Sequence, residues 1–119
     1  MIRGIFTGRT GLVTGGGRGI GRAICQMLAE NGAKVAINFQ QNELAAREVL
    51  ARVEQCGAQG LLVQADVASE ADVERMIREI GAEFGPVELL VNNAGIAAAE
   101  EHDQFGYAEW QRMFAVNVD

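Results

Sequence analysis

Five glycines within seven positions are the residues whose types and spacing most directly favour ligand chemistry: Gly15, Gly16, Gly17, Gly19 and Gly21. The β-forming residues Leu12 and Val13 precede them, and a helical pattern follows from Arg22. The first N–H groups of a helix have no partner within it, and the helix dipole adds partial positive charge there. Because glycine has no Cβ, the backbone of such a turn can approach a phosphate closely. The sequence therefore predicts an anion site at this turn.

The spacing of the glycines excludes two common phosphate motifs. The pattern G-x-G-x-x-G would need a third glycine where Ile20 stands, and no Gly-Lys-Ser/Thr follows. The pattern that fits is Thr14-Gly15-x-x-x-Gly19-x-Gly21. It resembles the cofactor motif of the short-chain dehydrogenase/reductase family, and this resemblance implies that Gly15, Gly19, Ile20 and Gly21 bind a nicotinamide dinucleotide. The alternative is a glycine-rich turn without a ligand.

Strand and helix patterns alternate along the chain. We expect strands at 10–14, 34–39, 60–65 and 87–91, and a last helix from 107 onward. The helix between the first two strands has an apolar stripe, which we place at Ile20, Ala23, Ile24, Met27 and Leu28. Asn42 is expected to cap the next helix, and Ser69 with Asp72 resembles a capping box for the third.

Near-continuous apolar strands separated by amphipathic helices predict a parallel sheet that is covered on both faces. The fold class is therefore α/β, a doubly wound Rossmann-like sheet, incomplete, with four strands in the order 3-2-1-4. We expect residues 1–119 to form a single NAD(P)-binding domain, with the ligand at the carboxyl ends of the strands.

Composition narrows the classes of partner. The chain has 119 residues, 49% of them hydrophobic, and a net charge of −6, which argues against nucleic acid or an anionic membrane. No signal-peptide pattern or transmembrane run is visible. Two cysteines in helical patterns favour reduced thiols and a cytoplasmic location. His102 is the only histidine, and no metal-ligand cluster is predicted.

Two strand ends suggest how an adenosine is held. The residues 38–42 contain no carboxylate that could bind the ribose hydroxyls of NAD. In the family, a basic residue at the position of Arg18 favours NADP, so we expect NADP, with NAD less favoured. Asp66 directly follows the third strand, and the resemblance implies that Asp66 and Val67 contact the adenine. The alternative for Asp66 is an ordinary turn or capping residue.

The fourth strand runs into Asn92-Asn93-Ala94-Gly95. Asparagine amides bind both backbone and ligands, and the small residues after them leave room for a ribose. An Asn-Asn pair in a turn is common, but in this strand it matches the family. The resemblance implies that Asn93, Ala94 and Gly95 bind the cofactor, and it extends over residues 10–119.

Asn117 lies on an apolar stripe of the last expected helix, with Trp110, Met113 and Phe114 at helical spacing. A polar side chain there needs partners or costs roughly 1–3 kcal/mol. The resemblance implies that Asn117 supports catalysis by organising a proton relay. The alternative is a solvated asparagine at a chain end.

The family's catalytic Ser and Tyr-x-x-x-Lys have no match in the chain. Tyr107 is followed four residues later by Gln111, Lys34 precedes the second strand, and Ser69 is a helix cap. A tyrosine without a cationic neighbour has a pKa near 10 and is a poor base at neutral pH. We therefore expect an amino-terminal portion that ends before the catalytic segment and is inactive alone.

Two functions are compatible with these residues. The first is the cofactor-binding half of an NAD(P)-dependent oxidoreductase that acts on a small carbonyl or alcohol. Within the family, Val35–Phe39 and Glu109–Phe114 most resemble 3-oxoacyl-carrier-protein reductases, and full-length members form homodimers or homotetramers. The second is a catalytically inactive nucleotide-binding or interaction module.

Overall fold

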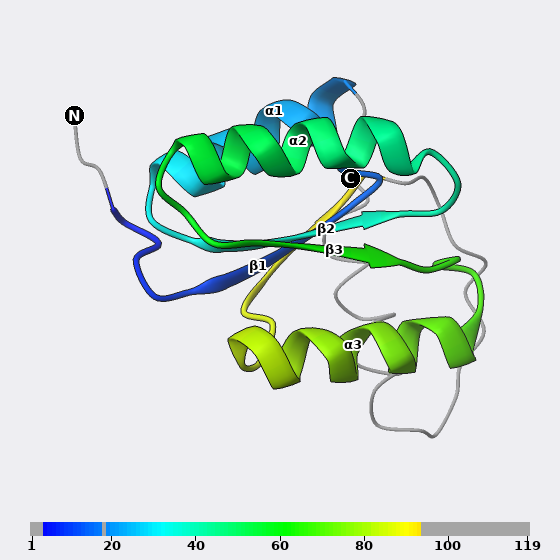
Figure 1. The fold of residues 1–119 in the computed structure, drawn as a ribbon. Coiled ribbons are helices and arrows are strands. Elements are labelled where there is room, and N and C mark those ends of the chain that lie inside the picture. The colour runs from blue at the N-terminus through cyan, green and yellow to red at the C-terminus, as the bar shows by residue number, and fades with distance from the viewer. Residues whose placement is uncertain (1–3, 18, 94–119) are drawn as a thin grey trace.

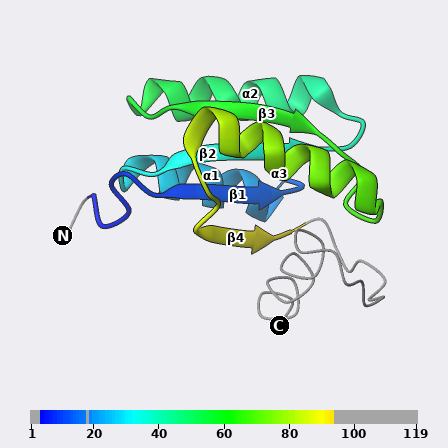
Figure 2. The ribbon, with the colours of Figure 1, turned by 90° about the horizontal axis from the view of Figure 1, so that it is seen from below.

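The computed structural model describes residues 4–17 and 19–93. Strands and helices alternate along this part of the chain in the order β1 (Thr10–Thr14), α1 (Gly19–Glu30), β2 (Lys34–Phe39), α2 (Glu43–Gln55), β3 (Gly60–Gln64), α3 (Glu70–Phe84) and β4 (Leu89–Asn92). All neighbouring strands pair in parallel, in the spatial order β3-β2-β1-β4 (Figure 2). The predicted α/β class and the strand order are confirmed.

Helices cover both faces of the sheet. In Figure 1, α1 and α2 lie above the sheet and α3 lies below it. The register places Val13 beside Ile37 on one side and beside Val91 on the other, so the carboxyl ends of the strands meet at one edge. In this described part of the chain, no helix has the length and apolar character needed to cross a membrane.

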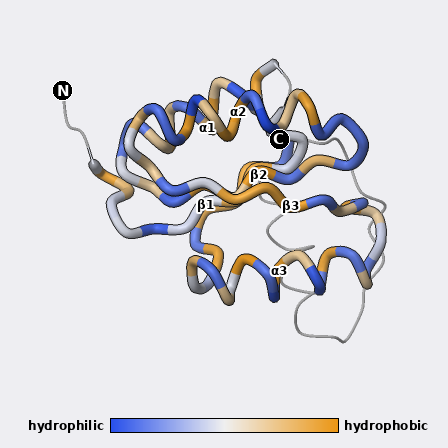
Figure 3. The backbone as a smooth tube through the Cα atoms, viewed as in Figure 1, coloured by the Kyte–Doolittle hydropathy of each residue, from blue (hydrophilic) through white to orange (hydrophobic). Residues whose placement is uncertain are grey.

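Two apolar clusters lie on opposite faces of the sheet. Leu12 and Ala36 pack toward α3, whereas their neighbours Val13 and Ile37 pack toward α1 and α2. Each of these four side chains is 0% exposed. Successive residues of a strand point to opposite faces, so a sheet covered on both sides needs apolar residues at every position. The hydrophobic stretches of β1, β2 and β3 in Figure 3 reflect this requirement.

The apolar stripe predicted for α1 is wrong in part, because Leu28 is buried and Ile24 packs against the core, whereas Ile20 and Met27 are exposed. The helix buries Gly21, Cys25, Leu28 and Ala29, whereas Ile20 is 71% exposed. Apolar side chains lie on two faces of this helix, so periodicity alone fits either face. Gly21 decides between them, because its small size lets that face approach the sheet.

The helix caps follow the prediction in part. Asn42 Oδ1 accepts from Ala45 N at 3.1 Å, and Ser69 Oγ accepts from Asp72 N at 3.2 Å. The second half of the capping box is absent, because Ser69 N already donates to Asp66 O. The Asp72 carboxylate accepts from Asp66 N instead, at 2.8 Å.

Two strands differ from the expected ranges at their ends. β3 stops at Gln64, one residue early, and β4 begins at Leu89 rather than at position 87. Val87 packs with the α3-facing cluster, and pairing with β1 starts where Leu89 meets Gly11.

Candidate functional site

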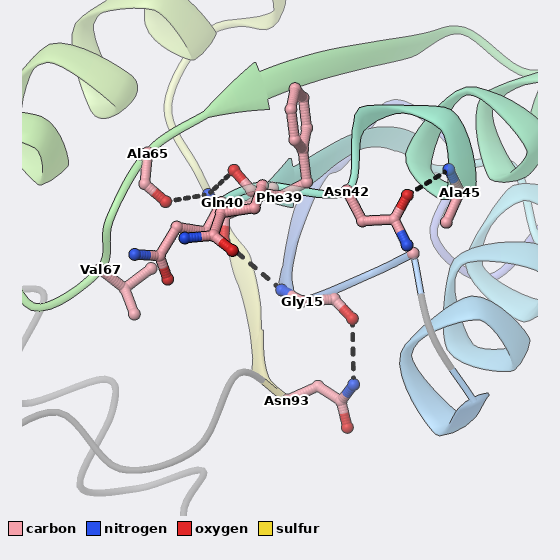
Figure 4. A pocket seen from close by; sticks show the side chains of 11 residues that line it. Gly15, Phe39, Gln40, Asn42, Ala45, Ala65, Val67 and Asn93 are labelled. Carbon is pink, nitrogen blue, oxygen red and sulfur yellow. Dashed lines mark hydrogen bonds between the residues drawn. The ribbon is translucent and has the colours of Figure 1, made fainter.

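A hollow of about 350 Å³ opens at the carboxyl edge of the sheet (Figure 4). Its walls come from four segments, which are the glycine turn, the end of β2 with the start of α2, the residues after β3, and the end of β4. Gly15, Asn38, Gln40, Val67 and Asn93 represent these segments. Ligands of open parallel sheets bind at this edge, so the hollow lies where the topology predicts a site.

Two glycines of the turn are needed by the fold itself. Gly15 has a φ of +62°, which L side chains rarely adopt. A Cβ on Gly21 would lie 2.5 Å from Asn93 Nδ2 and 2.7 Å from Gly15 O. The start of α1 can therefore approach the turn only because Gly21 has no side chain.

Gly19 and Ile20 face open space at the start of α1. A Cβ placed on Gly19 would meet no atom within 4 Å, although φ there is +42°. The first turn of α1 contains no acidic side chain to oppose the positive end of the helix dipole. Gly19 and Ile20 are thus accessible at the N-terminus of α1, whereas Gly21 is buried behind them.

Asn93 ties the end of β4 to the glycine turn. Its Nδ2 donates to Gly15 O at 3.1 Å, and its backbone N donates to Thr14 Oγ1 at 2.9 Å. The Thr14 hydroxyl donates in turn to Asn92 Oδ1 at 3.1 Å. These bonds hold the turn beside β4, and Figure 4 shows Asn93 pointing toward Gly15.

Asp66 follows β3 as expected, but its carboxylate takes part in a local turn. Its Oδ1 accepts from Ala68 N at 2.9 Å. The residues on either side, Ala65 and Val67, line the hollow. Within the described part of the chain, the second carboxylate oxygen has no hydrogen-bond partner that would prevent it from accepting from a ligand. The adenine contact of Asp66 and Val67 stays a prediction.

Uncharged residues form the rim of the hollow between β2 and α2. Phe39, Gln40, Gln41 and Asn42 line it, and none of them is a carboxylate or a cation. Asn42 is engaged as the cap of α2, as Figure 4 shows. The side chain amides of Gln40 and Gln41 are the groups of this rim available to a ribose or its phosphate.

Asn38 is a site residue that sequence reasoning missed. Its side chain is 2% exposed, and it hydrogen-bonds to the glycine turn and to the residues at the end of β3. The available signal was a lone polar residue inside the apolar pattern of 35–39.

Cys25 lies directly behind the turn. A Cβ on Gly16 would be 3.0 Å from its Sγ. Burial raises the pKa of the Cys25 thiol from 9.0 to about 12, because the thiolate would lose its solvation. This thiol is therefore a packing group of the turn rather than a nucleophile at neutral pH.

The remaining residues named in the sequence analysis fall into two groups, those that lie away from the hollow and those outside the described residues. Lys34 Nζ donates to Phe84 O at 2.9 Å, at the opposite edge of the sheet from the hollow, and Ser69 caps α3. Four predicted site residues lie outside the described residues, as does the helix expected from 107: Arg18, Ala94, Gly95 and Asn117. Among residues 4–17 and 19–93, no group of three His, Cys, Asp or Glu side chains is placed to hold a metal ion.

The profile of the short chain dehydrogenase family matches residues 9–119. The chain belongs to this family.

Curated relatives share about a third of the residues. Hydroxynaphthalene reductase arp2 of Aspergillus fumigatus is 34% identical over 113 residues, which are 95% of this chain and 41% of the relative. The 3-oxoacyl-[acyl-carrier-protein] reductase FabG of Staphylococcus epidermidis is 37% identical over 110 residues, 92% of this chain and 45% of the relative. The chain thus spans less than half the length of these relatives.

Solved structures of the family superimpose on the chain. A short-chain dehydrogenase/reductase from Serratia marcescens matches with a TM-score of 0.73 and 35% identity over 95% of this chain and 46% of its own. A short chain dehydrogenase from Burkholderia cenocepacia in complex with NADP has a TM-score of 0.72 and 37% identity over 95% and 45%. An NAD⁺-bound xylitol dehydrogenase has a TM-score of 0.73 and 35% identity over 77% and 35%.

Proposed function

We propose that this chain is the dinucleotide-binding portion of an NAD(P)-dependent oxidoreductase. The observation that carries the proposal is the hollow at the carboxyl edge, where the glycine turn meets the ends of β2 and β3. Its volume of about 350 Å³ lies within the usual range of about 300–1,000 Å³ for small-molecule pockets. Membership of the family supports the same assignment.

The residues present fit such a cofactor. The open space beside Gly19 leaves room for a pyrophosphate at the first N–H groups of α1, which belong to Gly19, Ile20 and Gly21. The uncharged polar hollow suits an adenosine, with Asp66 and Val67 beside the adenine. Asn93, with Ala94 and Gly95, would border the ribose next to the nicotinamide.

When bound, the nicotinamide supplies or accepts a hydride, and the substrate would be a small carbonyl compound or alcohol. The chain's own residues would orient the dinucleotide at the sheet edge, and Asn117 would support the proton relay. Similarity to the FabG relative makes a 3-oxoacyl thioester one candidate substrate. Assembly as a homodimer or homotetramer and a cytoplasmic location belong to the same proposal.

NADP is the cofactor that we favour. The rim formed by residues 39–42 has no carboxylate to repel a 2′-phosphate, and Arg18 adjoins the turn. One solved relative was crystallised with NADP and another with NAD⁺, so the family accommodates both. The preference for NADP over NAD therefore depends on the charge of residues 39–42 in this chain.

Equilibrium binding of NADPH and NADH to the 119-residue chain tests the proposal. We expect saturable binding that is tighter for NADPH than for NADH. The enhancement and blue shift of nicotinamide fluorescence would measure this binding. Gly19→Val should abolish it, because the new side chain fills the open space. Gly57→Val is the matched control, because Gly57 also has a positive φ and nothing within 4 Å of a Cβ, but it follows α2 and does not line the hollow. A folded chain that binds neither dinucleotide contradicts the proposal and favours the second function, an interaction module.

A further inference from the structure

Asn38 is a buried polar group for which the proposed cofactor contacts give no role. It stands one residue before the end of β2, lines the hollow and is 2% exposed. Its neighbours Val35, Ala36 and Ile37 are apolar and fully buried. A buried carboxamide is costly unless its donors and acceptor are all engaged, so its partners indicate what it does.

The partners of Asn38 belong to two other segments of the site. Its Oδ1 accepts from Gly15 N at 3.4 Å. Its Nδ2 donates to Val63 O at 3.3 Å and to Ala65 O at 3.2 Å. The backbone reinforces the link, because Asn38 O accepts from Gly16 N at 3.2 Å. One residue therefore joins the glycine turn after β1 to the segment that follows β3.

These partners demand the chemistry of a carboxamide. The Gly15 N–H donates to Asn38, whereas the carbonyls of Val63 and Ala65 accept from it. Asparagine offers both from one planar group, leucine offers neither, and an ionised aspartate offers acceptors only. The requirement is thus specific to the amide and is not met by polarity alone.

We propose that Asn38 is a positioning residue that fastens the glycine turn to the end of β3, and so holds the phosphate and adenine halves of the nucleotide pocket in register. The first half of this statement concerns the protein alone. The second half rests on the proposed function. The turn leads into α1 at Gly19, and Ala65 leads into Asp66, so displacing either segment changes the distance between the two halves.

Amide hydrogen exchange of the nucleotide-free chain tests the fastening without any ligand. In Asn38→Leu, the Gly15 amide loses its acceptor, and we expect its exchange to accelerate about tenfold or more relative to the Leu12 amide within β1. Asn31→Leu is the matched control, because the Asn31 side chain makes one exposed hydrogen bond, to Met27 O, at the other end of α1. Unchanged relative exchange at Gly15 in folded Asn38→Leu overturns the proposal.

Calorimetric titration with NADP⁺ tests the register of the pocket. Asn38→Leu should weaken binding about tenfold to a hundredfold, whereas Asn31→Leu should bind like the original chain. An Asn38→Leu protein that is merely less thermostable, and that binds NADP⁺ normally when folded, overturns the second half. A wild-type chain that binds no dinucleotide refutes the proposed function instead, and the exchange experiment still decides the fastening.

Asn38→Asp keeps the proposal testable where Asn38→Leu fails to fold. An ionised carboxylate would face the carbonyls of Val63 and Ala65, whereas its protonated form regains one donor. We expect NADP⁺ affinity, relative to wild type at each pH, to be weak at pH 8 and to recover toward pH 5. If the NADP⁺ affinity of Asn38→Asp relative to wild type does not change with pH, the proposal is overturned. A role of Asn38 in packing alone predicts no dependence of this ratio on pH.

Discussion

At the scale of single residues, the two cysteines carry the same thiol in opposite surroundings. Cys25 is 0% exposed within α1, whereas Cys56 is exposed where α2 ends. Burial raises the pKa of Cys25 to about 12, so the folded chain holds its proton while the unfolded chain releases it near pH 9.0. The buried thiol therefore makes stability depend on pH in the alkaline range.

The expected sign is a loss of stability as pH rises. Between pH 9.0 and about 12 the unfolded state binds fewer protons than the folded state, so the free energy of unfolding falls. At pH 10 the loss should be about 1.4 kcal/mol. Urea unfolding of wild type and Cys25→Ala between pH 7 and 10 measures it, since only the wild type should show this component. If the free energy of unfolding changes with pH at the same slope in both proteins, the prediction is contradicted.

The residues of the site were only partly predictable from the sequence. The glycines of the turn can be recognised from the sequence, because few structural requirements apart from a tight, ligand-binding turn place five glycines together. The role of Asn38 could not be predicted in this way, because the end of β2 suggested only a missing carboxylate. The partners of Asn38 lie about 25 residues away along the chain, directly after β1 and at the end of β3. A hydrogen-bonding role across three strands depends on register, which residue types alone do not give.

At the scale of elements, the sequence predicts a structural feature correctly where a single local sequence signal determines it. The turn after α1 is an example, because Gly32 lies two residues beyond Glu30 with a φ of +92°, the left-handed conformation that glycine commonly adopts where a helix ends. The face of α1 was mispredicted in part, because Ile20 and Met27 are as apolar as the residues that are buried. Only packing against the turn, through Gly21, selects between the two faces.

The cap of α3 gives a prediction at this scale. Ser69 Oγ accepts from Asp72 N, and its loss in Ser69→Ala should reduce the free energy of unfolding by about 1 kcal/mol. Ser69→Asp should restore most of that loss, because aspartate caps helices equally well. Urea denaturation of the three proteins measures the differences. Equal stability of the alanine variant and the wild type would show that the cap contributes nothing.

At the scale of the whole molecule, the alternation of strands and helices suffices to predict the fold. Each strand is too apolar to face water and each helix has one apolar side, so a sheet between two helix layers buries both. The two edges of the sheet were less obvious. Among the described residues, β3 and β4 each pair on one side only.

The outer edge of β4 predicts self-association of the 119-residue chain. Leu89, Leu90 and Val91 are apolar, and among the described residues only one edge of β4 is paired. The free edge of an apolar strand is a template for pairing with another chain. We expect the weight-average mass in sedimentation equilibrium to rise with concentration. Val91 O accepts from Thr14 Oγ1 of β1 at 3.4 Å, so Val91 faces β1, and alternation along a parallel strand turns the N–H of Leu90 away from β1.

Leu90→Pro removes that outward donor and should reduce the association, because proline is tolerated on edge strands and blocks further pairing. Leu90→Ala is the control for lost side-chain volume, and it should associate like the wild type. Circular dichroism would establish that both variants are folded. A wild-type chain that stays monomeric at all concentrations would show that this edge is covered. An equal decrease in both variants would assign the association to the Leu90 side chain rather than to its backbone.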